Sequence, residues 1–192
     1  MVRPRPFTVF LDASVLYPAP LRDILLELAV SDFFRAKWSA KVHDEWTKAV
    51  LRNRPDLDHA RLVRTRNLMD THVRDALVTG YEPLIEGLHL PDPHDRHILA
   101  AAIVSRADMI LTWNMKHFPK DLLEPWGMEA QDPDSFLVHQ LHLEPEAFVS
   151  ALRRVRKRLC KPSKTASEYL DILRKQRLAE TVAAIEAYQE LI

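Results

Sequence analysis

The stretch Phe7-Thr-Val-Phe-Leu-Asp-Ala-Ser14 decides the fold of this chain. Its first five residues are rich in aromatic and β-branched side chains, which is the pattern of a short strand buried on both faces. Such strands occur in parallel sheets that have helices on each side. Asp12 follows the strand directly, and open parallel sheets bind ligands beyond the carboxyl ends of their strands. The stretch therefore predicts a fold class and also the edge of the sheet where a site would lie.

Outward from this stretch, strand and helix patterns alternate. Further strands are predicted at residues 36–39, 109–113 and 127–131, and helices at residues 21–34, 40–51, 58–74 and 92–105, while residues 78–88 are left unassigned. Strands separated by helices predict an α/β fold with a central parallel sheet flanked by helices. Beyond residue 142 the patterns are helical, with helices expected at residues 167–176 and 178–191. We therefore expect a domain of residues 1–142 and a helical C-terminal extension of residues 143–192.

The composition narrows the class of protein. The 192 residues carry 27 Lys and Arg against 27 Asp and Glu, so the net charge is zero and any contact with nucleic acid must use a local basic patch. The run of residues 153–161 is a candidate patch, although a solvated helix face has the same pattern. The chain has 3 glycines and no glycine-rich phosphate loop.

The sequence also indicates where the protein works. The single cysteine, Cys160, excludes an internal disulfide bond and favours a reducing, cytoplasmic location. The longest uncharged stretch near the middle, residues 98–105, is too short to span a bilayer. Residues 1–6 contain no apolar segment of the signal-peptide type. We therefore expect no membrane segment.

Three acidic residues stand where an apolar residue would be expected. Asp12 ends the first strand, Glu45 lies at the edge of the apolar stripe of the helix that Ser39 caps, and Asp95 shares a helix face with apolar residues. Taken alone, each has an ordinary explanation. Asp12 could cap a turn, Glu45 could be a solvated carboxylate at the rim of the stripe, and Asp95 could be an acid favoured by the helix dipole. Asn114 repeats the position of Asp12 after another strand. Together they predict a divalent cation, because buried carboxylates need a cation or strong donors to stay charged.

In these residues the chain resembles PIN domains, the metal-dependent ribonuclease fold used by VapC-type toxins of bacterial toxin–antitoxin pairs. The resemblance covers roughly residues 7–142. It is carried by the segments Phe10-Leu-Asp-Ala-Ser14, Trp38-Ser39 leading to Glu45, Asp92-Pro-His-Asp-Arg-His-Ile-Leu-Ala-Ala-Ala102, Ala107-Asp-Met-Ile-Leu-Thr-Trp-Asn114, Phe118-Pro119 and Asp132-Pro-Asp-Ser-Phe-Leu137.

The resemblance implies a three-layer PIN-like fold, a Mg²⁺ or Mn²⁺ cofactor and a set of site residues. Catalysis would fall to Asp12, Glu45 and Asp95, which would also hold the metal, with Asp92 and Asn114 in support. The expected substrate-binding residues are Ser14, Thr112 and Arg96.

The chain departs from the PIN pattern at two positions. Asn114 stands at the fourth acidic position, which is often aspartate in the family. Many relatives with asparagine there carry an Asp-Phe pair shortly after, and this chain has His117-Phe118. We therefore expect a second metal to bind weakly or only with substrate. We expect His117 to be a surface histidine rather than a phosphate contact.

The expected activity is hydrolysis of RNA phosphodiester bonds by in-line attack of water, leaving a 5′-phosphate and a 3′-hydroxyl. The expected partners are RNA, a small antitoxin protein and a second copy of the chain. The antitoxin would lay an apolar helix over a groove walled by residues 21–34, and the tail could cover this groove, extend it or dimerise.

Two alternatives to this activity remain. One is a PIN-like module that binds RNA or protein without cleaving it. The other is a haloacid-dehalogenase-like phosphatase. It ranks last because Ser14 stands where that chemistry needs a second aspartate.

Overall fold

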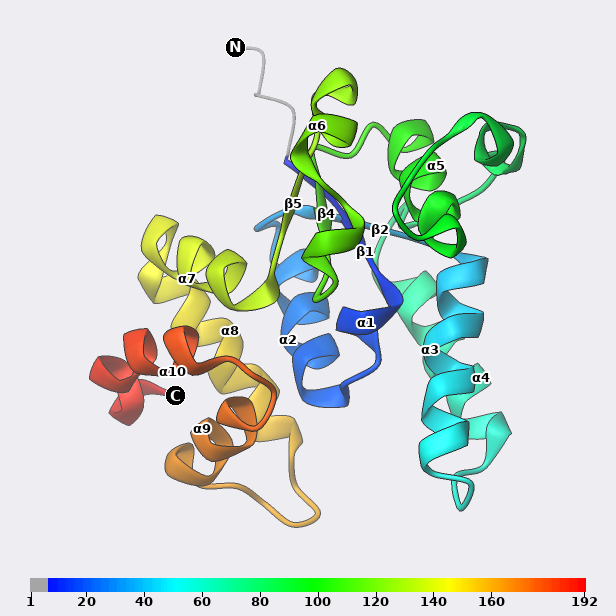
Figure 1. Ribbon diagram of the computed structural model, residues 1–192. Helices are drawn as coiled ribbons and strands as arrows, with labels where there is room; N and C mark the ends of the chain where they lie inside the picture. Colours follow the sequence, from blue (N-terminus) through cyan, green and yellow to red (C-terminus); the bar gives the residue numbers. More distant parts are fainter. Residues whose placement is uncertain (1–6) are drawn as a thin grey trace.

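A five-stranded parallel sheet forms the centre of the molecule (Figure 1). The computed structural model describes residues 7–192, so residues 1–6, where we expect no signal segment, lie outside the described part. The predicted parallel α/β sheet is confirmed. The strands are β1 (Thr8–Leu11), β2 (Arg35–Ser39), β3 (Leu77–Val78), β4 (Met109–Leu111) and β5 (Glu129–Gln131), in the spatial order β3-β2-β1-β4-β5.

Helices cover both faces of this sheet. The return from β3 to β4 crosses the sheet in the opposite direction to the run from β1 to β2, so right-handed crossovers place α5 opposite α2 and create three layers. None of the helices in residues 7–192 is both long and apolar enough to span a membrane. The elements between the strands are α1 (Ala13–Leu16), α2 (Ala19–Val30), α3 (Ala40–Asn53), α4 (His59–His72), the 3₁₀ turns η1 (Glu82–Gly87) and η2 (Pro93–Asp95), α5 (Arg96–Val104), η3 (Met115–His117), α6 (Lys120–Leu123) and η4 (Glu124–Trp126).

Side-chain caps start two of these elements at the residues that the sequence predicts. Ser39 accepts a hydrogen bond from the backbone N of Val42 at 3.3 Å and begins α3. Asp92 accepts one from the backbone N of His94 at 2.9 Å and begins η2, which leads into α5. Caps of this kind are worth about 1 kcal/mol each. Because these starts are fixed, the directions of the later side chains on the same elements are fixed as well.

The helix predicted at residues 21–34 is shorter in the structure. It ends at Val30, and Asp32 then takes a left-handed conformation with φ 62°. Phe34 leaves the helix and packs edge-on against Phe136, with 5.2 Å between the ring centroids. The unassigned residues 78–88 hold all of η1 and the last residue of β3, a strand of two residues that pairs with the end of β2.

The C-terminal helices dock on the body of the molecule, with α8 against α2 and α10 against α7 (Figure 1). Asp134 accepts hydrogen bonds from the backbone N atoms of Glu180 at 2.9 Å and Thr181 at 2.8 Å, and so caps α10. The division into domains at residues 142–143 stays a prediction. The elements after β5 are α7 (Pro133–Leu143), which ends the predicted domain, and the tail elements α8 (Pro145–Arg158), α9 (Ala166–Arg174), α10 (Ala179–Ile185) and η5 (Glu186–Leu191).

Several arginines of α8 make contacts with other parts of the same chain. Glu27 of α2 pairs with Arg154 and, at 2.6 Å, with Arg158. Arg156 donates to two backbone carbonyl oxygens of the tail. Arg154 and Arg158 therefore tie the tail to the body, while Arg156 holds parts of the tail together. Because α8 packs on α2, the face of α2 beneath it is not an open groove for a partner.

Candidate metal centre

The candidate site lies where the strand order of the sheet reverses. β1 and β4 are neighbours, while β2 lies beyond β1 and β5 lies beyond β4. Such a switch point leaves a crevice at the carboxyl ends of the strands. Asp12 and Thr112 are the residues that directly follow β1 and β4. The backbone N of Asp12 donates to the carbonyl oxygen of Leu111 at 3.1 Å, which continues the strand pairing to the very edge.

Two hydroxyl groups hold the Asp12 carboxylate. Those of Ser14 and Thr112 both donate to Asp12 Oδ2 at 2.6 Å. The same hydroxyls accept hydrogen bonds from the backbone N atoms of Trp113 at 3.1 Å and Asn114 at 3.0 Å. A hydroxyl has a single hydrogen to donate, and here both are spent on Asp12. The structure thus gives Ser14 and Thr112 a positioning contact, and the substrate contact that the sequence suggests for them stays a prediction.

Burial makes the charged form of Asp12 costly. Asp12 is 4% exposed, and this burial raises the pKa of its carboxyl group above the ordinary value. The hydrogen bonds from Ser14 and Thr112 oppose the shift, whereas the negative charge of Asp95 adds to it. The two carboxylates therefore feel each other's charge. A buried acid beside a second acid is the setting in which a bound cation restores the charged form.

Asp95 also belongs to a cluster of three candidate metal-binding side chains. One donor atom each from Asp92, Asp95 and His117 lie within 4.8 Å of one another. His117 Nδ1 is 2.7 Å from Asp95 Oδ2 and 3.8 Å from Asp92 Oδ2. The expectation that His117 is a plain surface histidine is therefore wrong. The 3₁₀ turn η3 begins after Asn114 and completes one turn at His117, and this turn brings the ring to the carboxylates.

Glu45 faces the start of α5. His97 Nε2 is 2.9 Å from Glu45 Oε1, and the His97 side chain is 1% exposed. Neither ring nitrogen of His97 makes a hydrogen bond of good geometry with the described residues, so the short contact with Glu45 is poorly aligned for a hydrogen bond. Asp44, next to Glu45, points elsewhere and pairs with Arg66 of α4 at 2.7 Å. Of these two neighbouring acids, Glu45 is the one directed toward the segment that carries Asp95.

The predicted residues differ in how tightly they gather. In residues 7–192, the close triad is formed by Asp92, Asp95 and His117, while Asp12 and Glu45 stand outside it. Arg96 is half-buried, and its Nε donates to the carbonyl oxygen of Pro93 at 3.1 Å. Asn114 is exposed at the start of η3.

The donor set fits a hard divalent cation. Carboxylate and amide oxygens are the ligands that Mg²⁺ and Mn²⁺ prefer, and an imidazole nitrogen suits the later transition metals. The structural observation that supports the fit is the Asp12 carboxylate, which is buried and held by two hydroxyl groups. Within residues 7–192, the donors that lie close enough to share one ion are Asp92, Asp95 and His117, while Asp12, Glu45 and Asn114 remain predicted ligands.

Comparisons with known proteins identify the family of the chain. A family model described as "PIN domain" matches residues 8–116, and a second, described as "VapC50 C-terminal domain", matches residues 133–187. A Mycobacterium tuberculosis protein named "Putative ribonuclease VapC50" is 40% identical over 101 residues. These residues cover 53% of the chain and 59% of that protein, so the chain spans less than two thirds of the relative's length. No solved structure matches the chain significantly.

Proposed function

Because the chain belongs to the PIN-domain family, we propose that it is a divalent-metal-dependent endoribonuclease and the toxin of a toxin–antitoxin pair. The observation that carries the proposal is the buried Asp12 at the switch point of the sheet, held by two hydroxyls and within electrostatic range of Asp95. The similarity to a protein named as a ribonuclease supports RNA as the substrate.

Each residue of the site has a separate task in this proposal. A divalent cation held by Asp12, Asp95 and neighbouring donors would polarise a phosphodiester group and make water a better nucleophile. Ser14 and Thr112 favour the ionised form of Asp12 and fix the direction of its carboxylate, because their hydrogen bonds oppose the rise in its pKa that burial causes. Glu45, directed by the His97 contact, would accept the proton of the attacking water. The products would be a 5′-phosphate and a 3′-hydroxyl.

The choice of metal is the next part of the proposal. Mg²⁺ favours an all-oxygen site, whereas Mn²⁺ accepts an imidazole ligand more readily. His117 points at Asp95 and Asp92, so its ring would join the ligands or anchor them. We therefore propose Mg²⁺ or Mn²⁺ as the cofactor. His117 should strengthen the binding of Mn²⁺ more than that of Mg²⁺.

Partners and location complete the proposal. A small antitoxin would block the carboxylate edge, and it would have to approach outside the face of α2 that α8 covers. A homodimer and a cytoplasmic location are also proposed, and the single free Cys160 supports a reducing compartment.

The decisive experiment compares neighbouring acids. Purified protein should cleave RNA when Mn²⁺ is added, and EDTA should stop the reaction. Asp12→Asn, Asp95→Asn and Glu45→Gln should each abolish cleavage while the protein stays folded. Asp44→Asn is the matched control beside Glu45 and should keep full activity. Undiminished cleavage by the first three variants would remove the site assignment.

A metal titration separates cleavage from simple binding. A nuclease site should raise the melting temperature as Mn²⁺ is added, because a ligand that binds the folded state stabilises it. If millimolar Mn²⁺ leaves the melting temperature unchanged, the result favours the alternative function, a PIN-like module that binds RNA or protein without cleaving it.

A further inference from the structure

A residue of the C-terminal tail reaches the edge of the sheet where the candidate site lies. The guanidinium carbon of Arg177 is 4.4 Å from the centroid of the Trp113 ring. Trp113 directly follows Thr112, and its backbone N donates to the hydroxyl of Ser14 that holds Asp12. Trp113 therefore contacts Arg177 through its ring and the hydrogen bonds around Asp12 through its backbone.

The turn between α9 and α10 presents Arg177 in a fixed position. Arg177 has φ 65°, a left-handed conformation that favours glycine. Leu173 and Leu178, on either side of it, are fully buried, and Asp134 caps the helix that follows. An arginine kept in a conformation better suited to glycine, in a well-anchored turn, motivates a functional hypothesis for that side chain.

The charge of Arg177 is used differently from that of other tail arginines. Arg154 and Arg158 pair with a glutamate of α2, and Arg174 pairs with two acids of the tail. Within residues 7–192, Arg177 has a contact with the Trp113 ring and no carboxylate partner. Stacking on an aromatic face uses the flat side of the guanidinium group and leaves its N–H edge free to bind a phosphate.

We propose that Arg177, stacked on Trp113, binds a backbone phosphate of the RNA strand beside the cleavage site. This inference rests on the proposed nuclease function. The chain has zero net charge and its candidate site is lined by carboxylates, so a polyanionic substrate needs a cation placed at the rim. The tail supplies that cation, and it is therefore part of the substrate-binding surface as well as a structural extension.

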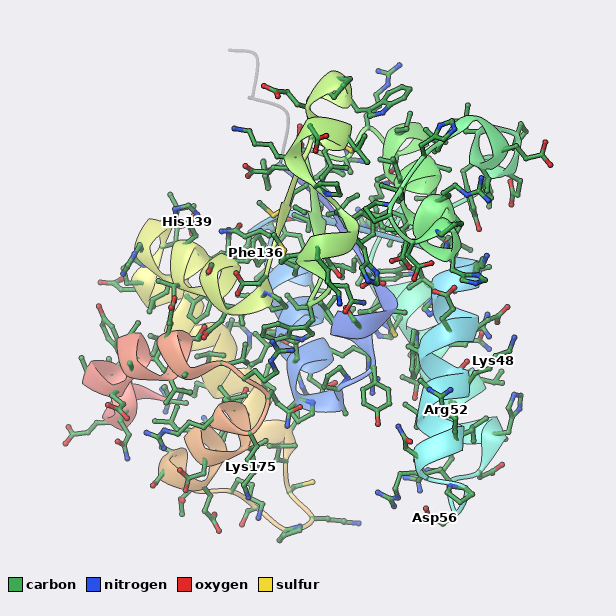
Figure 2. The ribbon with its side chains drawn as sticks, viewed as in Figure 1. Lys48, Arg52, Asp56, Phe136, His139 and Lys175 are labelled. Atoms are coloured by element: carbon green, nitrogen blue, oxygen red, sulfur yellow. The ribbon has the colours of Figure 1, made fainter. Side chains whose placement is uncertain are left out.

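The test measures RNA binding in a protein that does not cleave. A short fluorescein-labelled single-stranded RNA is titrated with the full-length Asp12→Asn protein, with and without Arg177→Gln, over a series of salt concentrations. Arg177→Gln should weaken binding about tenfold and lower the slope of log affinity against log salt by about 0.7. Arg52→Gln removes an exposed arginine in the last turn of α3 (Figure 2) and is the charge-matched control, which should change neither quantity.

Two further measurements separate substrate binding from a merely structural role. Arg177→Gly suits the positive φ and should melt close to the parent protein, yet bind RNA as weakly as the glutamine variant. In the cleaving protein, Arg177→Gln should raise KM about tenfold and leave kcat almost unchanged.

The outcomes distinguish this inference from the function on which it rests. If the parent protein binds RNA and both Arg177 variants bind it equally well, Arg177 is a structural contact and the inference is overturned, while the nuclease proposal stands. If the parent protein neither binds nor cleaves RNA, the nuclease proposal and this inference fall together.

Discussion

Thr112 and Asp12 are 100 residues apart in the sequence, and the hydroxyl of one donates to the carboxylate of the other at 2.6 Å. The contact closes the gap between β1 and β4 at the point where the strand order reverses. It links the fold to the chemistry, because the pairing of these two strands is what places a donor on the buried acid. The first two predictions follow from this contact.

Asp12→Asn should abolish cleavage and stabilise the metal-free protein. Burial raises the pKa of Asp12 in the folded state, so the folded state binds this proton more tightly than the unfolded state does. The stability that comes from this proton is present below the ordinary value of 3.8 and is lost as the pH rises through the raised folded-state pKa. In EDTA, the melting temperature of the variant should therefore rise relative to that of the wild type as the pH increases from acidic to neutral. The rise should be about 2–4 °C for each kcal/mol of unfolding free energy. A gain that does not depend on pH would contradict this account.

Thr112→Val should reduce both activity and stability. The change keeps the shape of the side chain, but it removes a donor to Asp12 and the acceptor for the backbone N of Asn114. Because Thr112 is fully buried, the unpaired groups should cost about 1–3 kcal/mol of unfolding free energy. The matched control is Thr71→Val, whose exposed hydroxyl contacts a helix carbonyl of α4. Urea unfolding and RNA cleavage measure the two effects, and full activity of Thr112→Val would refute the positioning role.

His117 should decide how the site ranks metals. His117→Ala should lower the Mn²⁺-induced rise in melting temperature more than the Mg²⁺-induced rise, since it removes a ring that points at Asp95 and Asp92. His117→Asp should reverse the ranking in favour of Mg²⁺. Thermal melting at several metal concentrations is the readout, and His142→Ala, an exposed histidine at the end of α7, is the control. If His117→Ala lowers the rise in melting temperature equally for both metals, His117 anchors the acids and does not select the ion.

Asp134→Ala should loosen the tail. The change leaves the backbone N atoms of Glu180 and Thr181 without their acceptor, at a cost of about 1–3 kcal/mol. Limited proteolysis should then cut first near α10. Asp171→Ala removes an exposed acid of α9 and should change neither stability nor cleavage by the protease. If both variants are equally stable, the cap is not what holds the tail.

Much of the fold follows from local patterns. The apolar run that ends at Asp12, the cap at Ser39 and the Asp92-Pro pair each act within a few residues, and the structure has β1, α3 and η2–α5 at those places. Asp44 and Glu45 show how far periodicity reaches. The stripe predicted Glu45 at its edge, and in the structure Glu45 contacts His97 while its neighbour Asp44 pairs with Arg66.

The features that the sequence did not predict depend on contacts between distant residues or on very short elements. β3 has two residues, too few for a periodic signal, and exists because the end of β2 offers a partner. His117 reaches Asp95 through a single 3₁₀ turn. Neither the Arg177–Trp113 stack nor the Asp134 cap leaves a trace in local composition, because each joins segments that meet after the tail has docked.

The Asp134 cap has a consequence for the order in which the protein is assembled on the ribosome. Asp134 is synthesised 46 residues before Glu180, and the last strand of the sheet, which ends at Gln131, is complete before either. The carboxylate edge can thus form on a nascent chain whose final helices are still unmade. Arg177 is synthesised after all the acidic residues of the candidate site, so these residues can be placed on the sheet edge before the arginine that stacks on Trp113 is made.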